Sequence, residues 1–478
     1  MSENCTDKFS GTFFCIQNIV RADGNIRLSI GEFMKLLFVS LGCDKNLVDS
    51  EEMLGLLTAN GFEIVDDETR AEVIVVNTCC FINDAKEESV NTILEMAEYK
   101  KEGTCKVLIV TGCMAQRYKN EIIEEVPEVD AVLGTTSYGD ILKAINEAMD
   151  GKHFQEFKDI DYLPEKLGKR VLTTGGHFGY LKIAEGCDKH CTYCIIPKLR
   201  GKFRSVPMER LVAQAQEMAE EGVKELILVA QETTVYGTDI YGKKSLHILL
   251  KELCKIKGIR WIRVLYCYPE EIYDELIQTM KKEKKICHYL DLPIQHASDR
   301  ILKRMGRRTT QAELVAIVNK LRQEIPDIVL RTTLITGFPG ETQEDHEELM
   351  GFVDEMEFDR LGVFTYSPEE DTPAADMPDQ IPEEVKEERR DEIMELQQEI
   401  SYDKGTDRIG QELMVMIEGK VADESAYIGR TYGDAPKVDG YIFVQTGELL
   451  MTGDFAKVRV TGALEYDLIG ELADEYTE

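Results

Sequence analysis

The chain has 478 residues, which is enough for roughly two to four domains with cores of their own. Its 43% hydrophobic and 30% charged content is typical of a soluble globular protein. The sequence contains no run of about 18 apolar residues, so we expect no membrane span. The formal net charge of −33 argues against a broad nucleic-acid-binding surface, because such a surface needs lysine and arginine to neutralise phosphates.

The beginning of the sequence shows no basic stretch followed by an apolar one, so we expect no secretory signal. Thirteen cysteines in a chain that is not exported indicate a reducing compartment, where thiols serve metals rather than disulfides. We therefore expect a cytoplasmic protein. Residues 1–33 have weak periodicity, and we expect them to form an extension with no role in the core.

Residues 34–151 alternate between short apolar runs and longer amphipathic stretches. The runs predict buried strands, and the stretches predict helices that cover the sheet. The expected strands are 35–40, 73–76, 106–110 and 131–133, and the expected helices are 46–59, 83–101, one from about residue 116, and 137–149. We predict an N-terminal α/β domain with a parallel sheet at 34–151, followed by a linker at 152–178.

Three cysteines of this first domain each come one to three residues after a different expected strand. They are Cys43, Cys79 and Cys113. Because the carboxyl ends of parallel strands meet at one edge of a sheet, these thiols are expected to converge there. Three convergent thiolates suggest an iron–sulfur cube with one open iron. The alternative is that each is an ordinary buried cysteine.

The α/β alternation begins again at residue 179 and continues to 402. Six strands are expected near 180–184, 225–229, 260–265, 288–292, 329–335 and 361–366, with helices near 207–221, 245–256, 269–281, 310–324, 342–356 and 383–402. The number of strands suits a barrel but is short of the eight of a complete one.

Three cysteines stand within eight residues at the start of this second domain, at the spacing C-x3-C-x2-C. They are Cys187, Cys191 and Cys194. Cysteine is the soft ligand that iron–sulfur clusters and zinc select. Three ligands hold three irons of a [4Fe–4S] cube and leave the fourth open, which a reactive cluster needs. A zinc site with His190 as fourth ligand, and thiols that bind no metal, are the alternatives.

The stretch from Glu185 to Gly201, which contains these cysteines, resembles the methylthiotransferases of the radical S-adenosylmethionine (SAM) superfamily. The resemblance implies an open six-unit (β/α) barrel for the central domain. It also implies that the open iron of the first cluster binds the amino and carboxylate groups of SAM, whose reductive cleavage yields a 5′-deoxyadenosyl radical.

The same resemblance assigns Cys43, Cys79 and Cys113 to a second, auxiliary [4Fe–4S] cluster whose open iron carries the sulfur. It places Tyr193 and the segment that contains Gln231 and Glu232 near bound SAM. No side chain other than the cluster ligands is assigned a catalytic role.

Residues 403–478 contain five short β runs separated by turns, at 412–418, 426–430, 440–445, 456–461 and 467–472. The pattern predicts a small all-β barrel or sandwich, and the resemblance identifies it as a TRAM domain that docks the macromolecular substrate. From Asp403 onward about 7 Lys and Arg stand against about 16 Asp and Glu. We therefore expect this domain to dock a basic protein rather than RNA, with Asp434 and Asp439 contributing if they face the partner.

Three stretches resemble the methylthiotransferases that modify an aspartate of small-subunit ribosomal protein twelve. They are 40–46, 231–237 and 434–440. The resemblance implies that the radical abstracts hydrogen from the aspartate β-carbon, and that a second SAM supplies the methyl group. An electron donor and a sulfur donor are further expected partners, whereas a membrane and a nucleic acid are not. A tRNA adenosine methylthiotransferase and a non-enzymatic iron–sulfur electron carrier are the alternatives.

Overall fold

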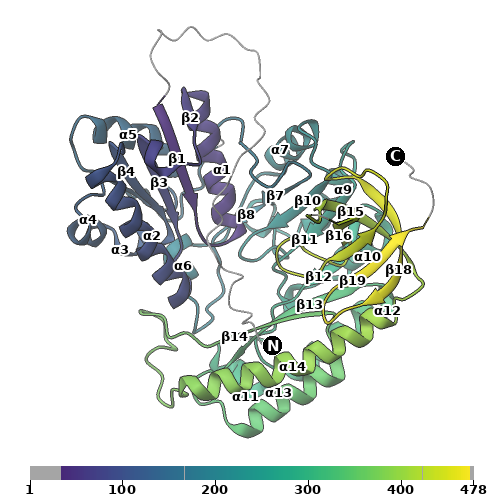
Figure 1. Cartoon of the computed structure of the whole chain (residues 1–478). Helices are drawn as coiled ribbons and strands as arrows, with labels where there is room; N and C mark the ends of the chain where they lie inside the picture. Colours follow the sequence, from purple (N-terminus) through teal and green to yellow (C-terminus); the bar gives the residue numbers. More distant parts are fainter. Residues whose placement is uncertain (1–33, 166, 423, 474–478) are drawn as a thin grey trace. The chain divides into compact units, whose positions relative to one another are not determined.

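The computed structural model describes residues 34–165, 167–422 and 424–473 (Figure 1). Residues 1–33, which we expect to form an extension, lie outside this range. The described chain forms two compact units. The first runs from Met34, where the described residues begin, to Thr173 and adds Glu185–Lys189 and Cys194–Arg204. The second holds Thr174–Ala184, His190–Tyr193 and the described residues from Ser205 onward.

The first unit is built on a six-stranded parallel sheet in the order β2-β1-β3-β4-β5-β6. The strands are β1 (Met34–Ser40), β2 (Phe62–Ile64), β3 (Val73–Thr78), β4 (Val107–Gly112), β5 (Ala131–Leu133) and β6 (Phe154–Glu156). β1, β3 and β4 are rich in Val, Ile and Leu, as expected of parallel strands that are buried on both faces.

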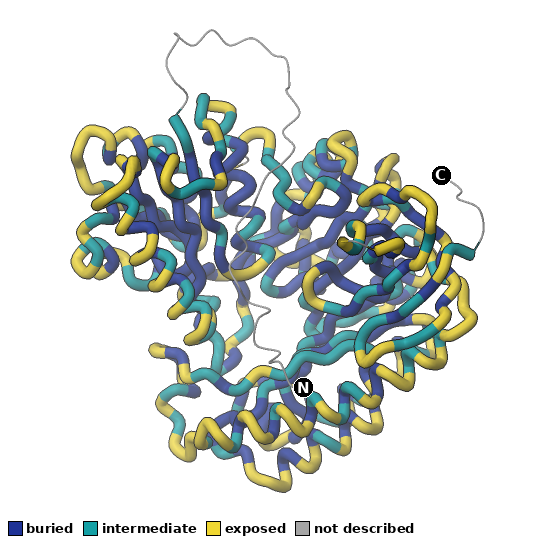
Figure 2. The backbone as a smooth tube through the Cα atoms, viewed as in Figure 1, coloured by how far each residue is buried: buried dark blue, intermediate teal, exposed yellow. Residues whose placement is uncertain are grey.

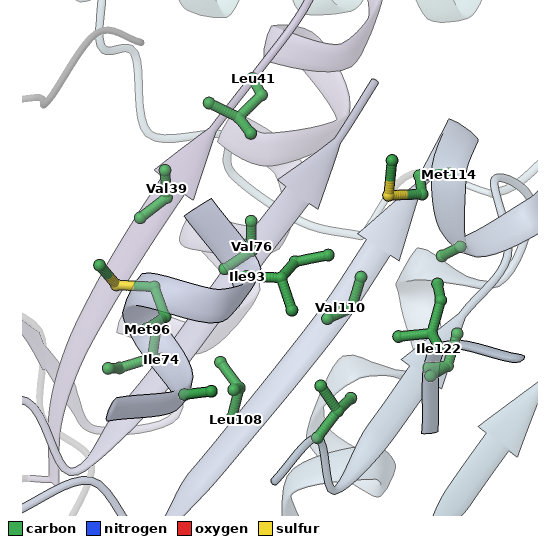
Figure 3. Close-up of a cluster of buried hydrophobic side chains, with 14 of the residues drawn as sticks. Val39, Leu41, Ile74, Val76, Ile93, Met96, Leu108, Val110, Met114 and Ile122 are labelled. Atoms are coloured by element: carbon green, nitrogen blue, oxygen red, sulfur yellow. The ribbon is translucent and has the colours of Figure 1, made fainter. Parts of the chain in front are cut away.

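Helices cover both faces of this sheet. They are α1 (Asp44–Ala59), α2 (Asn83–Glu102), α3 (Cys113–Tyr118), α4 (Asn120–Glu125), α5 (Ile141–Met149) and α6 (Ile196–Arg200). Because side chains alternate along a strand, one set of strand residues packs with α1 and α5, and the other set packs with α2, α3, α4 and α6. Figure 3 shows the core on the face covered by α2, α3, α4 and α6, in which Val76 and Val110 of the sheet lie beside Ile93 of α2.

One strand of this sheet lies in the segment that we expected to be a linker. β6 pairs in parallel with β5 at the edge of the sheet, where Ala131 lies opposite Phe154. Only Phe154 of its three residues is apolar, so β6 lacks the apolar run that marks the equally short β5, and the sequence did not reveal it.

The second unit contains a six-stranded parallel sheet in the order β14-β13-β12-β11-β10-β7. Its strands are β7 (Phe178–Lys182), β10 (Glu225–Val229), β11 (Trp261–Val264), β12 (Ile286–Asp291), β13 (Val329–Thr336) and β14 (Arg360–Thr365). All six expected strands are present and form an open sheet, which confirms the fold class predicted for the central domain.

The helices of the second unit come mainly between its strands, and two short strands precede them in the chain. The helices are α7 (Met208–Glu220), α8 (Thr238–Tyr241), α9 (Leu246–Cys254), α10 (Asp274–Lys282), α11 (Asp299–Arg304), α12 (Gln311–Glu324), α13 (Gln343–Met356) and α14 (Glu383–Thr406), and the short strands are β8 (Ala184–Glu185) and β9 (Arg204–Ser205). The sequence did not predict α8 and α11, which have only four and six residues.

The C-terminal strands form a closed five-stranded barrel in the order β15-β16-β17-β19-β18, as the sequence predicts. They are β15 (Glu412–Lys420), β16 (Ala426–Thr431), β17 (Ile442–Gln445), β18 (Phe455–Ala463) and β19 (Leu468–Leu472). Val415, Ile442 and Val458 belong to its apolar core. In Figure 2 the inner strands of both sheets are largely buried, whereas the outer helix faces and loops are exposed.

A buried network of charges joins the barrel to the central sheet within the second unit. Glu225 of β10 accepts from Arg263 of β11 at 2.8 Å and from Arg430 of β16 at 2.7 Å. Arg430 also donates to Glu418 of β15 at 2.7 Å, and Glu418 lies 2.8 Å from Nε2 of His177. Burial disfavours the charged carboxylate of Glu225, but the two guanidinium groups outweigh it and lower its pKa.

Two acids of the barrel serve the same junction, which corrects our expectation that Asp434 and Asp439 could face a partner protein. Asp434 is buried and accepts from Nε of Arg360 at 3.1 Å. The Asp439 side chain is 2% exposed and accepts from the Tyr289 hydroxyl at 2.7 Å. Whether a charged residue is exposed depends on which element packs against it, and the sequence does not give that.

Within the described part of the chain, no helix combines the length and the apolar character that a membrane crossing needs.

The buried network predicts a large effect of Arg430→Met on stability. The substitution leaves Glu225 buried with one cation fewer, which is expected to lower the free energy of unfolding by about 3–5 kcal/mol. Chemical denaturation followed by circular dichroism measures the change. Lys457→Met is the matched control, because Lys457 pairs with Glu412 at the barrel surface and its loss should leave stability nearly unchanged. Equal unfolding of both variants would contradict the role of the network.

Candidate iron–sulfur sites

The three cysteines of the first unit follow three adjacent parallel strands. β1 pairs with β3 and β3 with β4, so that Ser40 lies opposite Asn77 and Thr78 opposite Gly112. Cys79 directly follows β3, and Cys113 directly follows β4. Cys43 comes three residues after β1 and immediately before α1. The three thiols are thus carried by neighbouring strand ends at one edge of the sheet, as the sequence predicts.

The loops that carry Cys43 and Cys79 pack closely. A Cβ atom built on Gly42 would lie 2.6 Å from Cβ of Cys79 and 2.9 Å from its Sγ. Gly42 also has a φ of +86°, which glycine adopts without strain. A glycine before Cys43 therefore lets the Cys79 side chain lie against the backbone of the neighbouring loop.

Asn46 of α1 holds the two loops together. Its Nδ2 donates to the carbonyl oxygen of Leu41 at 3.0 Å and to that of Thr78 at 2.9 Å. Asn77 in turn donates to the Asn46 carbonyl oxygen at 3.0 Å. All three polar side-chain contacts are buried, so they fix the loops in one geometry.

Negative charge on the cysteine sulfurs at this edge of the sheet is unfavourable unless a positive charge lies nearby. Burial raises the pKa of the Cys79 thiol well above its ordinary value, and the neighbouring Cys113 and Cys43 raise it further. Burial also raises the pKa of Cys113, while the Arg200 guanidinium opposes that shift. The three sulfur atoms are near enough to repel one another as thiolates, and a bound cation would relieve that repulsion.

Sequence reasoning did not single out Arg200. It ends α6, its side chain is 2% exposed, and its Nη2 lies 3.5 Å from Sγ of Cys113. The only sequence signal was its place in the stretch from Glu185 to Gly201 that carries the family resemblance.

The cysteines of the C-x3-C-x2-C segment are divided between the two units. In the first unit, the backbone N–H of Cys187 donates to the Gly201 carbonyl oxygen at 3.1 Å, and its Sγ accepts from the backbone N–H of Lys189 at 3.4 Å. Cys194 belongs to the same unit and is half-buried. In the second unit, Sγ of Cys191 lies 3.6 Å from the Tyr268 hydroxyl.

The residues expected near SAM have different surroundings within the second unit. Tyr193 packs against a core cluster that contains Met305 and Phe338. Glu232 is buried, and its Oε1 accepts from the backbone N–H of Thr234 at 3.1 Å. Gln231 is half-buried beside it. Glu232 therefore orders its own turn, and the role of the three residues in SAM binding stays a prediction.

A second buried cation that the sequence did not reveal is Arg307. Its guanidinium stacks over the ring of Tyr268 at 4.3 Å and donates to the Pro293 carbonyl oxygen at 3.1 Å. Burial disfavours its charge, but Tyr193, Tyr268 and other neighbours outweigh that cost and raise its pKa. The second unit thus holds a permanent positive charge near Tyr193.

The donor chemistry of these residues fits iron–sulfur clusters. Each set supplies three cysteine sulfurs, which are the ligands such clusters use, and the first set adds a buried guanidinium that offsets thiolate charge. In the described residues, no group of three His, Cys, Asp or Glu side chains is arranged to hold a metal ion. The assignment of all six cysteines as ligands stays a prediction.

Comparison with known families divides the chain into three matching regions. Residues 35–134 match the uncharacterized protein family UPF0004, residues 181–353 match the radical SAM superfamily, and residues 409–473 match the TRAM domain.

Similar proteins extend over nearly the whole chain. A ribosomal protein uS12 methylthiotransferase RimO of Lachnoclostridium phytofermentans is 66% identical over 437 residues, which cover 91% of this chain and 99% of the relative. A protein of the same name from Clostridium perfringens is 53% identical over 443 residues, which cover 92% of this chain and 98% of the relative.

Among solved structures, the radical S-adenosylmethionine methyltransferase TsrM from Kitasatospora setae, solved with cobalamin and a [4Fe–4S] cluster bound, has a similar fold. The TM-score is 0.52 at 13% identity, over 72% of this chain and 77% of TsrM. At this identity the likeness shows the fold alone, and it supports the fold class of the central domain.

Burial predicts the order in which the thiols of the first unit react in the metal-free chain. Iodoacetamide should label the exposed Cys43 faster than the buried Cys79 and Cys113, because a buried thiol is shielded and forms little thiolate. Mass spectrometry of the cysteine peptides over time measures the rates. The buried Cys267 is the reference for a slow thiol. Labelling of Cys79 and Cys113 as fast as Cys43 would contradict this geometry.

Proposed function

The chain belongs to the family of ribosomal protein uS12 methylthiotransferases, and from that premise we propose that it attaches a methylthio group to the β-carbon of an aspartate in uS12. The observation that carries the proposal is the presence of two cysteine triplets on a radical SAM fold, one following β1, β3 and β4 and the other at C-x3-C-x2-C spacing before α6. A cytoplasmic location, an electron donor and a sulfur donor belong to the same proposal.

Cys187, Cys191 and Cys194 would hold one [4Fe–4S] cluster, and Cys43, Cys79 and Cys113 a second. Bound with SAM, the first supplies a carbon radical that can remove an unactivated hydrogen, and the second supplies sulfur. The chain's own share is to position the groups and to exclude water. Tyr193, Gln231 and Glu232 are proposed to line the SAM site.

Two observations support the proposal that side chains of the second unit position the bound cofactor. The Tyr268 hydroxyl lies near Sγ of Cys191, and Arg307 stacks on the same tyrosine ring. Arg307 is buried and stacks on the half-buried Tyr268, so the pair presents a fixed charge and a fixed dipole beside Cys191 rather than mobile ones. This arrangement orients a charged cofactor without a side chain that exchanges protons.

The barrel is proposed to dock the protein substrate through one end. Glu424 in the β15–β16 turn and Glu448 in the β17–β18 loop are exposed, and their neighbours Ser425 and Thr446 are bonded through the backbone at 3.1 Å. Leu449 of the same loop is 89% exposed. Exposed acids beside an exposed apolar residue suit a basic protein with an apolar anchor, and they would repel the phosphates of RNA.

The two cysteine triplets predict the iron content of variants. The reconstituted chain should hold about eight irons, in two four-iron cubes. Replacing Cys187, Cys191 and Cys194 by Ala should halve the iron and abolish SAM cleavage. Replacing Cys43, Cys79 and Cys113 should also halve the iron, but SAM cleavage should persist while sulfur transfer is lost.

Iron analysis and chromatography of 5′-deoxyadenosine measure both effects. The buried Cys267 and Cys287, which contribute to packing, provide matched controls, and their replacement by Ala should leave the iron content unchanged. If both triple variants keep full iron, the ligand assignment is wrong.

The docking proposal predicts charge-dependent binding of uS12. Glu424→Lys with Glu448→Lys should weaken binding of the isolated ribosomal protein, and added salt should weaken binding to the unaltered chain. Glu465→Lys is the control, because Glu465 is exposed in the β18–β19 loop at the other end of the barrel. Fluorescence titration with tRNA as competitor measures the affinities. Tighter, salt-sensitive binding of tRNA would instead favour a tRNA adenosine methylthiotransferase.

A further inference from the structure

The position of Arg200 is fixed by the same segment that carries the C-x3-C-x2-C cysteines. Arg200 is the last residue of α6, and Gly201 follows it with a φ of +71°. The Gly201 carbonyl oxygen accepts from the backbone N–H of Cys187 at 3.1 Å. A Cβ atom on Gly186 would lie 2.1 Å from the Lys202 carbonyl oxygen, so these two stretches of backbone are in close contact. The backbone of Cys187 is therefore bonded to the turn that holds Arg200.

The guanidinium of Arg200 reaches from this turn to the edge of the first sheet. Its Nη1 donates to Asp49 of α1 at 2.8 Å and lies 3.4 Å from Glu185. Its Nη2 donates to Oδ1 of Asn46 and lies 3.5 Å from Sγ of Cys113. All of these residues belong to the first unit, and the Asp49 and Glu185 side chains are nearly as buried as that of Arg200.

Arg200 is connected to all three cysteine-bearing strand ends. It contacts Cys113 directly. Through Asn46 it is connected to Leu41 and Thr78, whose carbonyl oxygens accept from Nδ2 of that asparagine. The planar guanidinium can donate to the Asp49 carboxylate and to the Cys113 sulfur at the same time, which a lysine ammonium on a flexible stem cannot do.

We propose that Arg200 is a positioning residue of the site formed by Cys43, Cys79 and Cys113, where its guanidinium donates to the Cys113 sulfur and stabilises the more negative, reduced state of the cluster bound there. The inference rests on the proposed assignment of these cysteines as ligands. Hydrogen bonds and positive charge at a ligand sulfur raise the reduction potential of an iron–sulfur cluster. Asp49 and Glu185 hold the guanidinium at the sulfur and limit the rise.

The test uses the full-length chain in which Cys187, Cys191 and Cys194 are replaced by Ala, so that any remaining cluster belongs to the first unit. Its reduction potential is measured by a titration followed by electron paramagnetic resonance. Arg200→Met, which removes the charge and the donors, should shift the potential to a more negative value. Arg200→Lys should also shift the potential to a more negative value, but by less. The lysine keeps the positive charge, although it lacks the planar set of donors of the guanidinium. Arg170→Met, which removes the half-buried partner of Glu51 on α1, is the control and should leave the potential unchanged.

Each outcome decides a separate point. If the parent with three Ala substitutions holds no iron, the ligand assignment fails and the inference fails with it. If the Arg200 variants hold iron at the parent potential, the inference alone is overturned. If they lose iron while circular dichroism shows the metal-free chains folded and the Arg170 control keeps its iron, the positioning role is supported. If the metal-free Arg200 variants are unfolded, Arg200 serves the fold and the proposal is wrong.

Discussion

The adjacency of three parallel strands is the constraint on which the rest of the first unit depends. β1, β3 and β4 are neighbours, and each is buried on both faces. Parallel pairing places their carboxyl ends at one edge, which brings three cysteines 36 and 34 positions apart in sequence to neighbouring loops. The buried Asn46 and Arg200 then have a fixed frame to bond to. A shift of one strand by a single residue would turn its side chains to the opposite face and disperse the site.

Buried arginines occur at two places in this acidic chain where distant segments pack together. Arg200 lies at the cysteine edge of the first unit, and Arg263 and Arg430 lie between the central sheet and the barrel of the second. Each is paired with carboxylates, as buried charges must be. The acidic residues of this chain, whose net charge is −33, are therefore of two kinds. Some are exposed, and others are paired with arginines inside the protein. The exposed share, including Glu448 on the barrel, is the part that a basic partner can meet.

The sequence predicted most of the fold because the signals were local. Buried strands such as β10 contain a continuous apolar run, and the positions of Cys79 and Cys113 follow from where their strands end. It did not predict β2 or β6, each of three residues, or the burial of Asp434, Asp439 and Arg430, because these depend on partners far away in the chain. Arg200 and Arg307 were passed over for the same reason. An arginine is exposed by default, and only the folded arrangement shows that its donors face sulfur or an aromatic ring.

The most direct test of the proposed chemistry follows the hydrogen that is removed. The chain is reconstituted with iron and sulfide without oxygen and is given SAM, a reductant and uS12 whose aspartates carry deuterium on the β-carbon. Mass spectrometry should find deuterium in 5′-deoxyadenosine and one methylthio group on a single aspartate of uS12. Formation of 5′-deoxyadenosine without deuterium, together with methylthio groups on tRNA adenosine, would contradict the account.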